Sequence, residues 1–252
     1  GGAWVLYNAD CLDGFGAAWA AWKRFGDTAH YLPVRHGEPL PALPPGVMLY
    51  ILDFCYPPAI LCEAARRAAR IVVLDHHASA QAAFEHHMTQ HGRLPERLTA
   101  RFDQMHSGCV LSWKHFHGTA ALPPLLAHIE DRDLWRHHLP GTREINLALF
   151  LRLPMPFAEV ERLSLAGLRR EGKVLRRQQQ RSVRRLAQAR HRMTLFGVDG
   201  LAVNAPPQFA SELGETLALQ SGTFGLIYHF QGQRNRWECS LRSRGDFDVA
   251  GL

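Results

Sequence analysis

Residues 71–77 read Ile-Val-Val-Leu-Asp-His-His, an apolar run that ends in an acid and two adjacent histidines. Four branched apolar residues in succession are typical of a buried strand. Carboxylate and neutral imidazole are the side chains that hold divalent transition metals in proteins. A strand end is also a rigid position from which to hold them. The stretch therefore predicts a strand with a metal-binding group at its tip.

The segments before this stretch alternate between strand and helix. The apolar segments 3–8 and 48–53 predict strands, and apolar spacings of three and four residues predict a helix over 14–25. An Ala/Arg-rich helix is expected over 59–70, after Pro57-Pro58. This alternation predicts an α/β fold with a parallel sheet, crossover connections and helices on both faces. Ligands bind such sheets beyond the carboxyl ends of the strands. The polar residues that follow those ends are Asp10, Asp13, Asp53, Asp75, His76 and His77.

In the second half of the chain, the pattern of apolar and polar residues changes after Gly197. Before that residue, the pattern predicts a helix over 123–135 that ends in acids and a long basic helix over 157–193. After it, strand, helix and hairpin patterns predict a smaller α/β domain, at 200–205, 210–220, 224–230 and 236–242. The expected domains are a first α/β domain over 1–155, a helical linker over 156–197 and a C-terminal domain over 198–252.

Composition limits the class of protein. Of the 252 residues, 46% are hydrophobic and 21% charged, as in ordinary globular proteins. No run approaches about 18 apolar residues, so we expect no membrane span. The first residues show no basic region followed by a long apolar segment, so we expect no secretory signal. The five cysteines form no Cys-x-x-Cys pair, which disfavours disulfides and favours a reducing cytoplasm. The net charge of +6 favours an anionic partner.

Carboxylates and imidazoles in four separate segments suggest a two-metal site. Hydrolysis of a phosphodiester needs an activated water and neutralised phosphoryl oxygens, and two divalent cations about 4 Å apart supply both. Holding the cations takes several carboxylates, one of them bridging, together with imidazole. The candidates are Asp10, Asp13, Asp53, Asp75, His76, His77 and Asp131. A single aspartate after a strand is usually a turn or cap residue. The joint pattern therefore carries the hypothesis of a two-metal phosphoesterase.

On these residues the chain resembles the DHH phosphoesterase superfamily, which is named after its Asp-His-His motif. The loop Asn8-Ala9-Asp10-Cys11-Leu12-Asp13-Gly14 is similar to the opening His/Asp/Asp-Gly motif of the family. Leu52-Asp53 resembles the lone strand-end aspartate that usually bridges the metals. Asp75-His76-His77 resembles the third motif, in which the first histidine is a ligand and the other two residues support it.

The fourth motif and the small domain extend the resemblance over essentially the whole chain. Within Glu130-Asp131-Arg132-Asp133, Asp131 matches the last aspartate ligand of the family. The stretch 240–250 looks like part of the DHH-associated C-terminal domain, which in the family leads to a Gly-rich loop with a histidine that clamps the substrate phosphate. The sequence stops at Leu252, before such a loop, so it looks truncated.

The resemblance implies roles for the candidate residues. It implies two bound manganese ions, with magnesium or cobalt as alternatives. The implied metal-site residues are Asn8, Asp10, Asp13, Asp53, Asp75, His76 and Asp131. The implied catalytic residues are Asp13, Asp53, His76, His77 and Asp131. The implied substrate-binding residues are His106, Ser107, Arg242 and Arg244, of which the arginines present a planar fork to phosphate.

The architecture of a catalytic domain with a small C-terminal domain resembles nanoRNases, cyclic-dinucleotide phosphodiesterases and RecJ-type exonucleases. The chain lacks the extra domains of a long-strand exonuclease, which implies a short oligonucleotide or dinucleotide substrate and nucleoside monophosphate products. Cleavage polarity stays open, and a homodimer is compatible with this reading.

Two alternatives remain. The first is a phosphoanhydride hydrolase acting on pyrophosphate or polyphosphate, although the aromatic residues of the small domain favour a substrate with bases. The second is a nucleotide-binding module with weakened catalysis, because Asn8 stands where the family has a metal-binding histidine. A neutral amide is a poorer ligand for manganese than imidazole.

Overall fold

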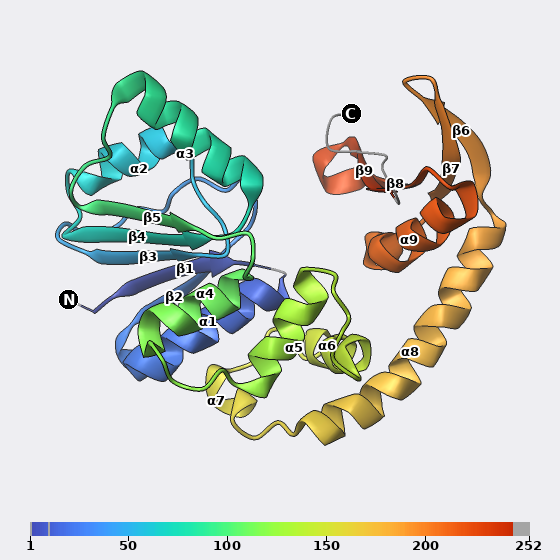
Figure 1. Cartoon of the computed structure of the whole chain (residues 1–252), viewed down its shortest axis with the longest axis horizontal. Helices are drawn as coiled ribbons and strands as arrows, with labels where there is room; N and C mark the ends of the chain where they lie inside the picture. The colour runs from blue at the N-terminus through green and yellow to red at the C-terminus, as the bar shows by residue number, and fades with distance from the viewer. Residues whose placement is uncertain (1, 10, 244–252) are drawn as a thin grey trace. The chain divides into compact units, whose positions relative to one another are not determined.

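The computed structural model describes residues 2–9 and 11–243, and the chain divides into two compact units, Gly1–Lys173 and Val174–Leu252. The first unit is built on a five-stranded, wholly parallel sheet with the strand order β2-β1-β3-β4-β5 (Figure 1). Its strands are β1 (Trp4–Asn8), β2 (His30–Val34), β3 (Met48–Leu52), β4 (Arg70–Asp75) and β5 (Leu98–Phe102). The predicted α/β class with a parallel sheet is confirmed for this unit.

Helices cover both faces of this sheet. One face carries α1 (Leu12–Phe25), α4 (Gly108–His117), α5 (Pro124–Asp133) and α6 (Thr142–Phe150), and the opposite face carries α2 (Pro58–Ala65) and α3 (Ala78–His91) (Figure 1). Successive strand residues point to opposite faces, so Tyr50 and Leu52 of β3 enter the first core while Leu49 and Ile51 enter the second. This double burial is why the central strands are apolar runs rather than alternating patterns.

Neither edge strand of this sheet, β2 or β5, was predicted from the sequence. Both carry residues that suit an edge, because Pro33 donates no hydrogen bond and Arg101 is exposed. The helix α3 was also not predicted, and only Phe84 of its 14 residues is buried. Its polar composition gives no clear helical periodicity.

The basic segment that follows the first unit's core holds more than one element. The short helix α7 (Phe157–Val160) precedes α8 (Leu165–Gln188), which crosses the division between the two units. The prediction of one helix over 157–193 is wrong at its end, because α8 stops at Gln188 and the strand β6 (His191–Leu195) begins three residues later. This strand pairs with the next one through His191, Met193 and Leu195, whose two-residue spacing is that of a β-strand.

The second unit contains a mixed sheet with the order β6-β7-β8-β9. Besides β6, its elements are β7 (Val198–Asn204), α9 (Ala210–Ser221), β8 (Phe224–Gln231) and β9 (Arg236–Ser243). The β7–β8 pair is parallel and the pairs on either side of it are antiparallel. The helix α9 packs Leu213 and Leu217 against Val203 and Ile227. Short 3-10 turns lie at Gly26–Thr28, Pro207–Phe209 and Gly232–Arg234.

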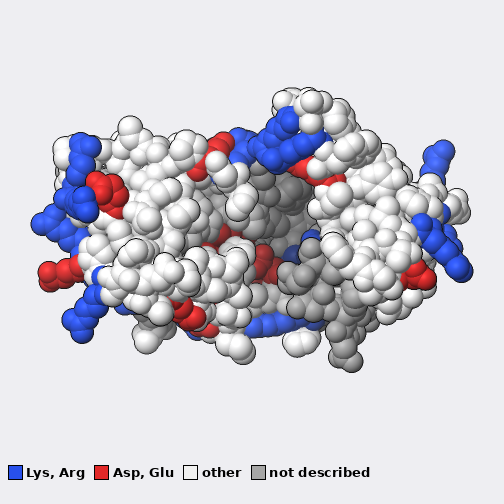
Figure 2. Space-filling model, turned by 90° about the horizontal axis from the view of Figure 1, so that it is seen from above, with Lys and Arg blue, Asp and Glu red and all other residues white. Residues whose placement is uncertain are grey.

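Two surface properties bear on the partners of the chain. Among the described residues, none of the helices combines the length and the apolar character that crossing a membrane requires. On the face shown in Figure 2, basic and acidic side chains are interspersed with wide uncharged areas. The net charge of +6 is therefore not gathered into one continuous basic patch on that face.

Candidate metal centre

The carboxyl edge of the parallel sheet gathers three acids around one histidine. His76 follows β4, and its Nε2 lies 3.2 Å from Asp53 Oδ1, 3.6 Å from Asp13 Oδ2 and 3.5 Å from Asp133 Oδ2. Asp13 stands in the first turn of α1, Asp53 directly after β3 and Asp133 at the end of α5. The structure thus brings Asp13, Asp53 and His76 together, as the sequence predicts. We call Asp13, Asp53, His76 and Asp133 the acidic cluster.

Backbone amides fix the first acid of the acidic cluster. Gly108 N donates to Asp13 Oδ2 at 2.6 Å, and Cys109 N donates to Asp13 Oδ1 at 2.9 Å. These amides belong to the first turn of α4, where amides lack partners within the helix and attract anions. A Cβ atom at residue 108 would lie 2.6 Å from Asp53 Cβ, so only glycine allows this close approach. This role of Gly108 was not predicted from the sequence.

The second acid holds an uncommon backbone conformation. Asp53 has a φ of 63°, in the left-handed region that residues with a side chain enter at a cost. Its carboxylate is almost wholly buried and accepts a hydrogen bond of 3.2 Å from Asn8 Nδ2 at Oδ2. Burial, together with repulsion by Asp13, raises the pKa of Asp53 well above its ordinary value. Asn8 therefore lies in the site, where it acts as a donor to an acid.

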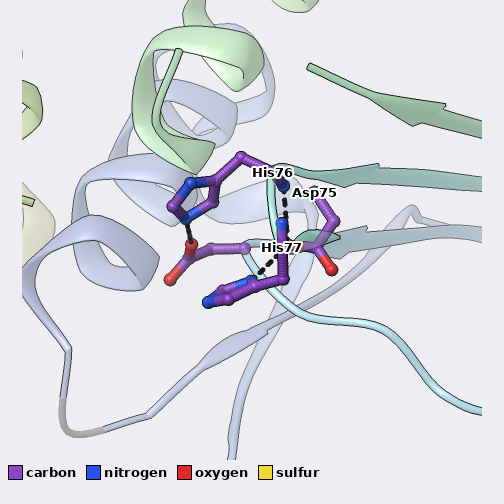
Figure 3. A group of neighbouring side chains, drawn as sticks. Asp75, His76 and His77 are labelled. Atoms are coloured by element: carbon purple, nitrogen blue, oxygen red, sulfur yellow. Dashed lines mark hydrogen bonds and ion pairs between the residues drawn. The ribbon is translucent and has the colours of Figure 1, made fainter. Parts of the chain in front are cut away.

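The acid of the Asp-His-His stretch organises its own turn. Asp75 Oδ1 accepts from His76 N at 2.8 Å and from His77 Nδ1 at 2.6 Å, and Figure 3 shows the His77 ring bonded back to Asp75 while the His76 ring points away from it. The other oxygen, Asp75 Oδ2, is buried and has no hydrogen-bond partner among the described residues. The hydrogen bond to Asp75 raises the pKa of His77, while burial lowers that of His76. Burial thus favours the neutral form of His76, which can offer a lone pair.

The structure at the end of α5 differs from the predicted ligand set. Asp131 is absent from the acidic cluster, and Asp133 belongs to it. Asp131 instead accepts from His138 N at 2.8 Å, Leu139 N at 3.0 Å and Thr142 Oγ1 at 2.5 Å. Burial opposes the ionised form of Asp131, but these three hydrogen bonds outweigh it and lower its pKa. The prediction of Asp131 as a metal ligand is therefore not supported by its position.

Helix periodicity explains the difference between these two acids. Residues two apart on a helix point in nearly opposite directions, because each residue turns the helix by about 100°. Asp133 lies four residues after Ile129 and seven after Leu126, and both of those residues belong to the core beneath α1 and α4. Residues at such spacings share a helix face. The signal that singles out Asp133 was therefore present in the sequence.

Burial is the main cause of the raised pKa of Asp133, and repulsion by Asp13 adds to it. Its side chain remains 26% exposed, yet desolvation and the charge of Asp13 raise its pKa to about 7. The raised pKa values of Asp53 and Asp133 share one origin, which is the packing of carboxylates against one another in a poorly solvated space. A bound cation relieves such repulsion.

The two predicted residues of the loop before α4 differ in accessibility. His106 Nδ1 donates to Glu130 Oε2 at 3.2 Å, and His106 Nε2 accepts from Lys114 Nζ at 2.7 Å, with 31% of the side chain exposed. Ser107 is fully buried, and its hydroxyl lies 3.3 Å from Cys109 Sγ. The structure thus leaves His106 accessible but does not place the Ser107 side chain as a substrate contact.

The remaining predicted residues lie elsewhere. Arg242 is on β9 of the second unit, where its Nη2 lies 3.4 Å from Ser211 Oγ. Arg244 and Asp10 lie outside the described residues. Their predicted roles stay predictions.

The acidic cluster fits a divalent cation by its donor set and spacing. Two groups that share His76 bring ligand atoms within 4.8 Å of one another: Asp13, His76 and Asp133 in one, and Asp53, Asp75, His76 and His77 in the other. An octahedral cation with ligands at about 2.1 Å keeps adjacent ligand atoms about 3 Å apart. The distances of 3.2–3.6 Å from His76 Nε2 to three carboxylates are near this value. Asp75 offers one carboxylate oxygen to the second of these groups.

Comparisons with known proteins give one relative and no assigned function. The chain is 31% identical over 155 residues to an uncharacterized protein of Acanthamoeba polyphaga mimivirus. The match covers 56% of this chain and 35% of the viral protein, so the chain spans about a third of that relative's length. The chain matches no model of a known protein family.

Proposed function

We propose that the protein is a metal-dependent phosphodiesterase of the DHH type that hydrolyses short oligonucleotides or dinucleotides to nucleoside monophosphates. The observation that supports this proposal most strongly is the convergence of Asp13, Asp53 and Asp133 on His76 Nε2 at the carboxyl edge of the sheet. The order of the sequence motifs adds the resemblance on which the substrate class rests.

Particular residues would hold the cations. Asp13, Asp53, His76 and Asp133 offer three carboxylates and one neutral imidazole, and Asp75 and His77 complete the second group. Manganese suits a mixed oxygen and imidazole set, and magnesium or cobalt are alternatives. When bound, such ions supply an activated water and neutralise charge on the phosphoryl group.

The protein's own contribution is positioning. Asp75 fixes the turn from which both histidines project, through bonds to His76 N and His77 Nδ1. The amides of Gly108 and Cys109 hold Asp13 in one orientation. Such supporting contacts keep ligands pre-aligned and tune their basicity.

A panel of substrates tests the proposal. Oligonucleotides of two to five residues and cyclic dinucleotides would be incubated with the protein and Mn²⁺, and separately with a chelator. We expect nucleoside monophosphates in the first case and none in the second. Metal-dependent release of phosphate from pyrophosphate or polyphosphate, with all of the nucleotides left intact, would instead establish the phosphoanhydride hydrolase.

Asn8 favours a second candidate, a nucleotide-binding module with weakened catalysis. An amide that donates to Asp53 offers no imidazole lone pair to a cation. Under the leading proposal, Asn8→His raises the affinity for Mn²⁺ and the rate of hydrolysis of a labelled dinucleotide. If neither form turns over the dinucleotide and both bind it tightly, the protein is the binding module.

The cellular setting is also a proposal. All five cysteines are free thiols, and we place the protein in a reducing cytoplasm, with short nucleic acid as its partner.

A further inference from the structure

The loop that directly follows Asp133 of the acidic cluster has a strained backbone conformation. Trp135 and His137 both have a φ near 55°, in the left-handed region, which a residue with a side chain as bulky as that of Trp135 seldom adopts. Trp135 lies two residues after Asp133. Strain of this kind persists only where the surrounding structure enforces it, and it concentrates at binding and catalytic sites.

Asp131 enforces this conformation. Its carbonyl oxygen accepts from Arg136 N at 3.0 Å and from His137 N at 3.1 Å. Its carboxylate accepts from His138 N and Leu139 N. One buried residue thus holds four successive amides of the loop. This gives Asp131 a role that differs from ligation.

The strained loop carries the indole side chain of Trp135, which does not pack in the apolar cores. Trp135 is 36% exposed and belongs to neither of the two large cores of the first unit. In contrast, Trp19 and Trp113 are less than a tenth exposed and stack on each other in the core. Burial of apolar surface therefore does not account for the strain at Trp135.

The indole is fixed by cationic and aromatic neighbours. The guanidinium carbon of Arg132 lies 4.0 Å from the ring centroid of Trp135, and that of Arg143 lies 5.6 Å from it. The His137 ring meets Trp135 edge-on at 4.9 Å. These contacts orient the ring in advance and place positive charge beside it. A pre-oriented ring next to guanidinium groups suits a ligand that has both an aromatic base and a phosphate.

We propose that Trp135, with Arg132 and Arg143 against its ring, is a subsite for the nucleobase next to the scissile phosphate, and this inference rests on the proposed function. The exposed indole stacks on the base, and the arginines attract the phosphate. Stacking on an aromatic side chain tolerates every base, because each has a π-face. The subsite therefore binds short nucleic acids without selecting a sequence.

A binding experiment tests the subsite without requiring turnover. Calorimetry with the Mn²⁺-loaded protein would give dissociation constants for adenosine monophosphate and for ribose 5-phosphate, which lacks the base. We expect the wild type to prefer the nucleotide, Trp135→Ala to lower that preference roughly tenfold and Trp135→Phe to keep most of it. Phe150→Ala is the matched control, since Phe150 is 45% exposed in the same unit, and it should keep the full preference.

A second variant separates binding from folding. Glycine adopts a φ of 55° without the cost that alanine meets. Trp135→Gly should therefore have a higher melting temperature than Trp135→Ala and yet be equally poor at distinguishing the nucleotide from ribose 5-phosphate.

The outcomes of this test and of the substrate panel are distinct. No base preference in the wild type, or a full preference in Trp135→Ala, overturns the subsite. A base preference that depends on Trp135 in a protein that hydrolyses no oligonucleotide keeps the subsite and removes the proposed hydrolysis. Hydrolysis with a Michaelis constant that Trp135→Ala leaves unchanged removes the subsite alone.

Discussion

The last turn of α5 contains two aspartates with opposite surroundings. Asp131 accepts three hydrogen bonds at its carboxylate, and its pKa is lowered. Asp133 faces other acids across His76, and its pKa is raised to about 7. The first arrangement is complete without any other group, whereas under the proposed function the second gains stability from a cation. The comparison separates an acid that supports the structure from an acid that is available for chemistry.

The largest expected effect follows from removing a charge in the acidic cluster. Asp53→Asn keeps the shape of the side chain but removes a ligand charge, so we expect hydrolysis of a dinucleotide with Mn²⁺ to fall by about a thousandfold, or about 4 kcal/mol of barrier. The metal-free variant should be no less stable than the wild type, because one repelling carboxylate is gone. Steady-state rates and thermal melts measure the two effects.

Asp27→Asn is a control for this change, since Asp27 is exposed, accepts a hydrogen bond from Trp22 Nε1 and does not belong to the acidic cluster. It should leave the rate unchanged. An Asp53→Asn protein within tenfold of the wild-type rate would remove Asp53 from the reaction.

Truncating the two α5 acids should have opposite effects on stability. Asp131→Ala leaves two backbone amides and the Thr142 hydroxyl without their acceptor, so we expect a loss of about 3 kcal/mol in the free energy of unfolding. Asp133→Ala removes repulsion and should leave metal-free stability equal or higher. Urea denaturation with a chelator present measures both. A larger loss for Asp133→Ala than for Asp131→Ala would reverse our assignment of the two roles.

The stability of the metal-free protein should also depend on pH through Asp133, and this effect should be smaller than those above. An acid whose pKa is raised on folding binds more protons in the folded state, so its contribution to stability falls as pH rises from its ordinary value of about 4 through about 7. Solvent at the 26% exposed side chain screens part of the repulsion. We therefore expect a loss of about 1 kcal/mol, or about 2–4 °C in melting temperature, between pH 5 and pH 8.

Calorimetric scans at the two pH values measure this loss. The comparison with Asp133→Asn isolates the part of this loss that is due to Asp133. Equal pH dependence in both proteins would show that Asp133 has an ordinary pKa.

The sequence predicted most of what sets up the site. The central strands β1, β3 and β4 are apolar runs, and the parallel order places Asp13, Asp53 and His76 at one edge. Edge strands give weaker signals because only part of their surface is buried. That difference accounts for the failure to predict β2 and β5.

The two features of the site that were not predicted differ in kind. The choice between Asp131 and Asp133 depends on the rotation of α5 about its axis, which the motif alone does not specify but the spacing of Asp133 from Leu126 and Ile129 indicates. The need for glycine at 108 depends on the close approach of α4 to Asp53, which are 55 positions apart in the sequence. This second contact is not local, so no pattern within one segment reports it.

The most direct test of the acidic cluster is a calorimetric titration of Mn²⁺ into the metal-free protein and into two matched variants. We predict saturable binding by the wild type, near-wild-type binding by Asp131→Asn under conditions where it is folded, and binding at least tenfold weaker for Asp133→Asn. Wild-type affinity in Asp133→Asn together with loss of binding in folded Asp131→Asn would contradict the account.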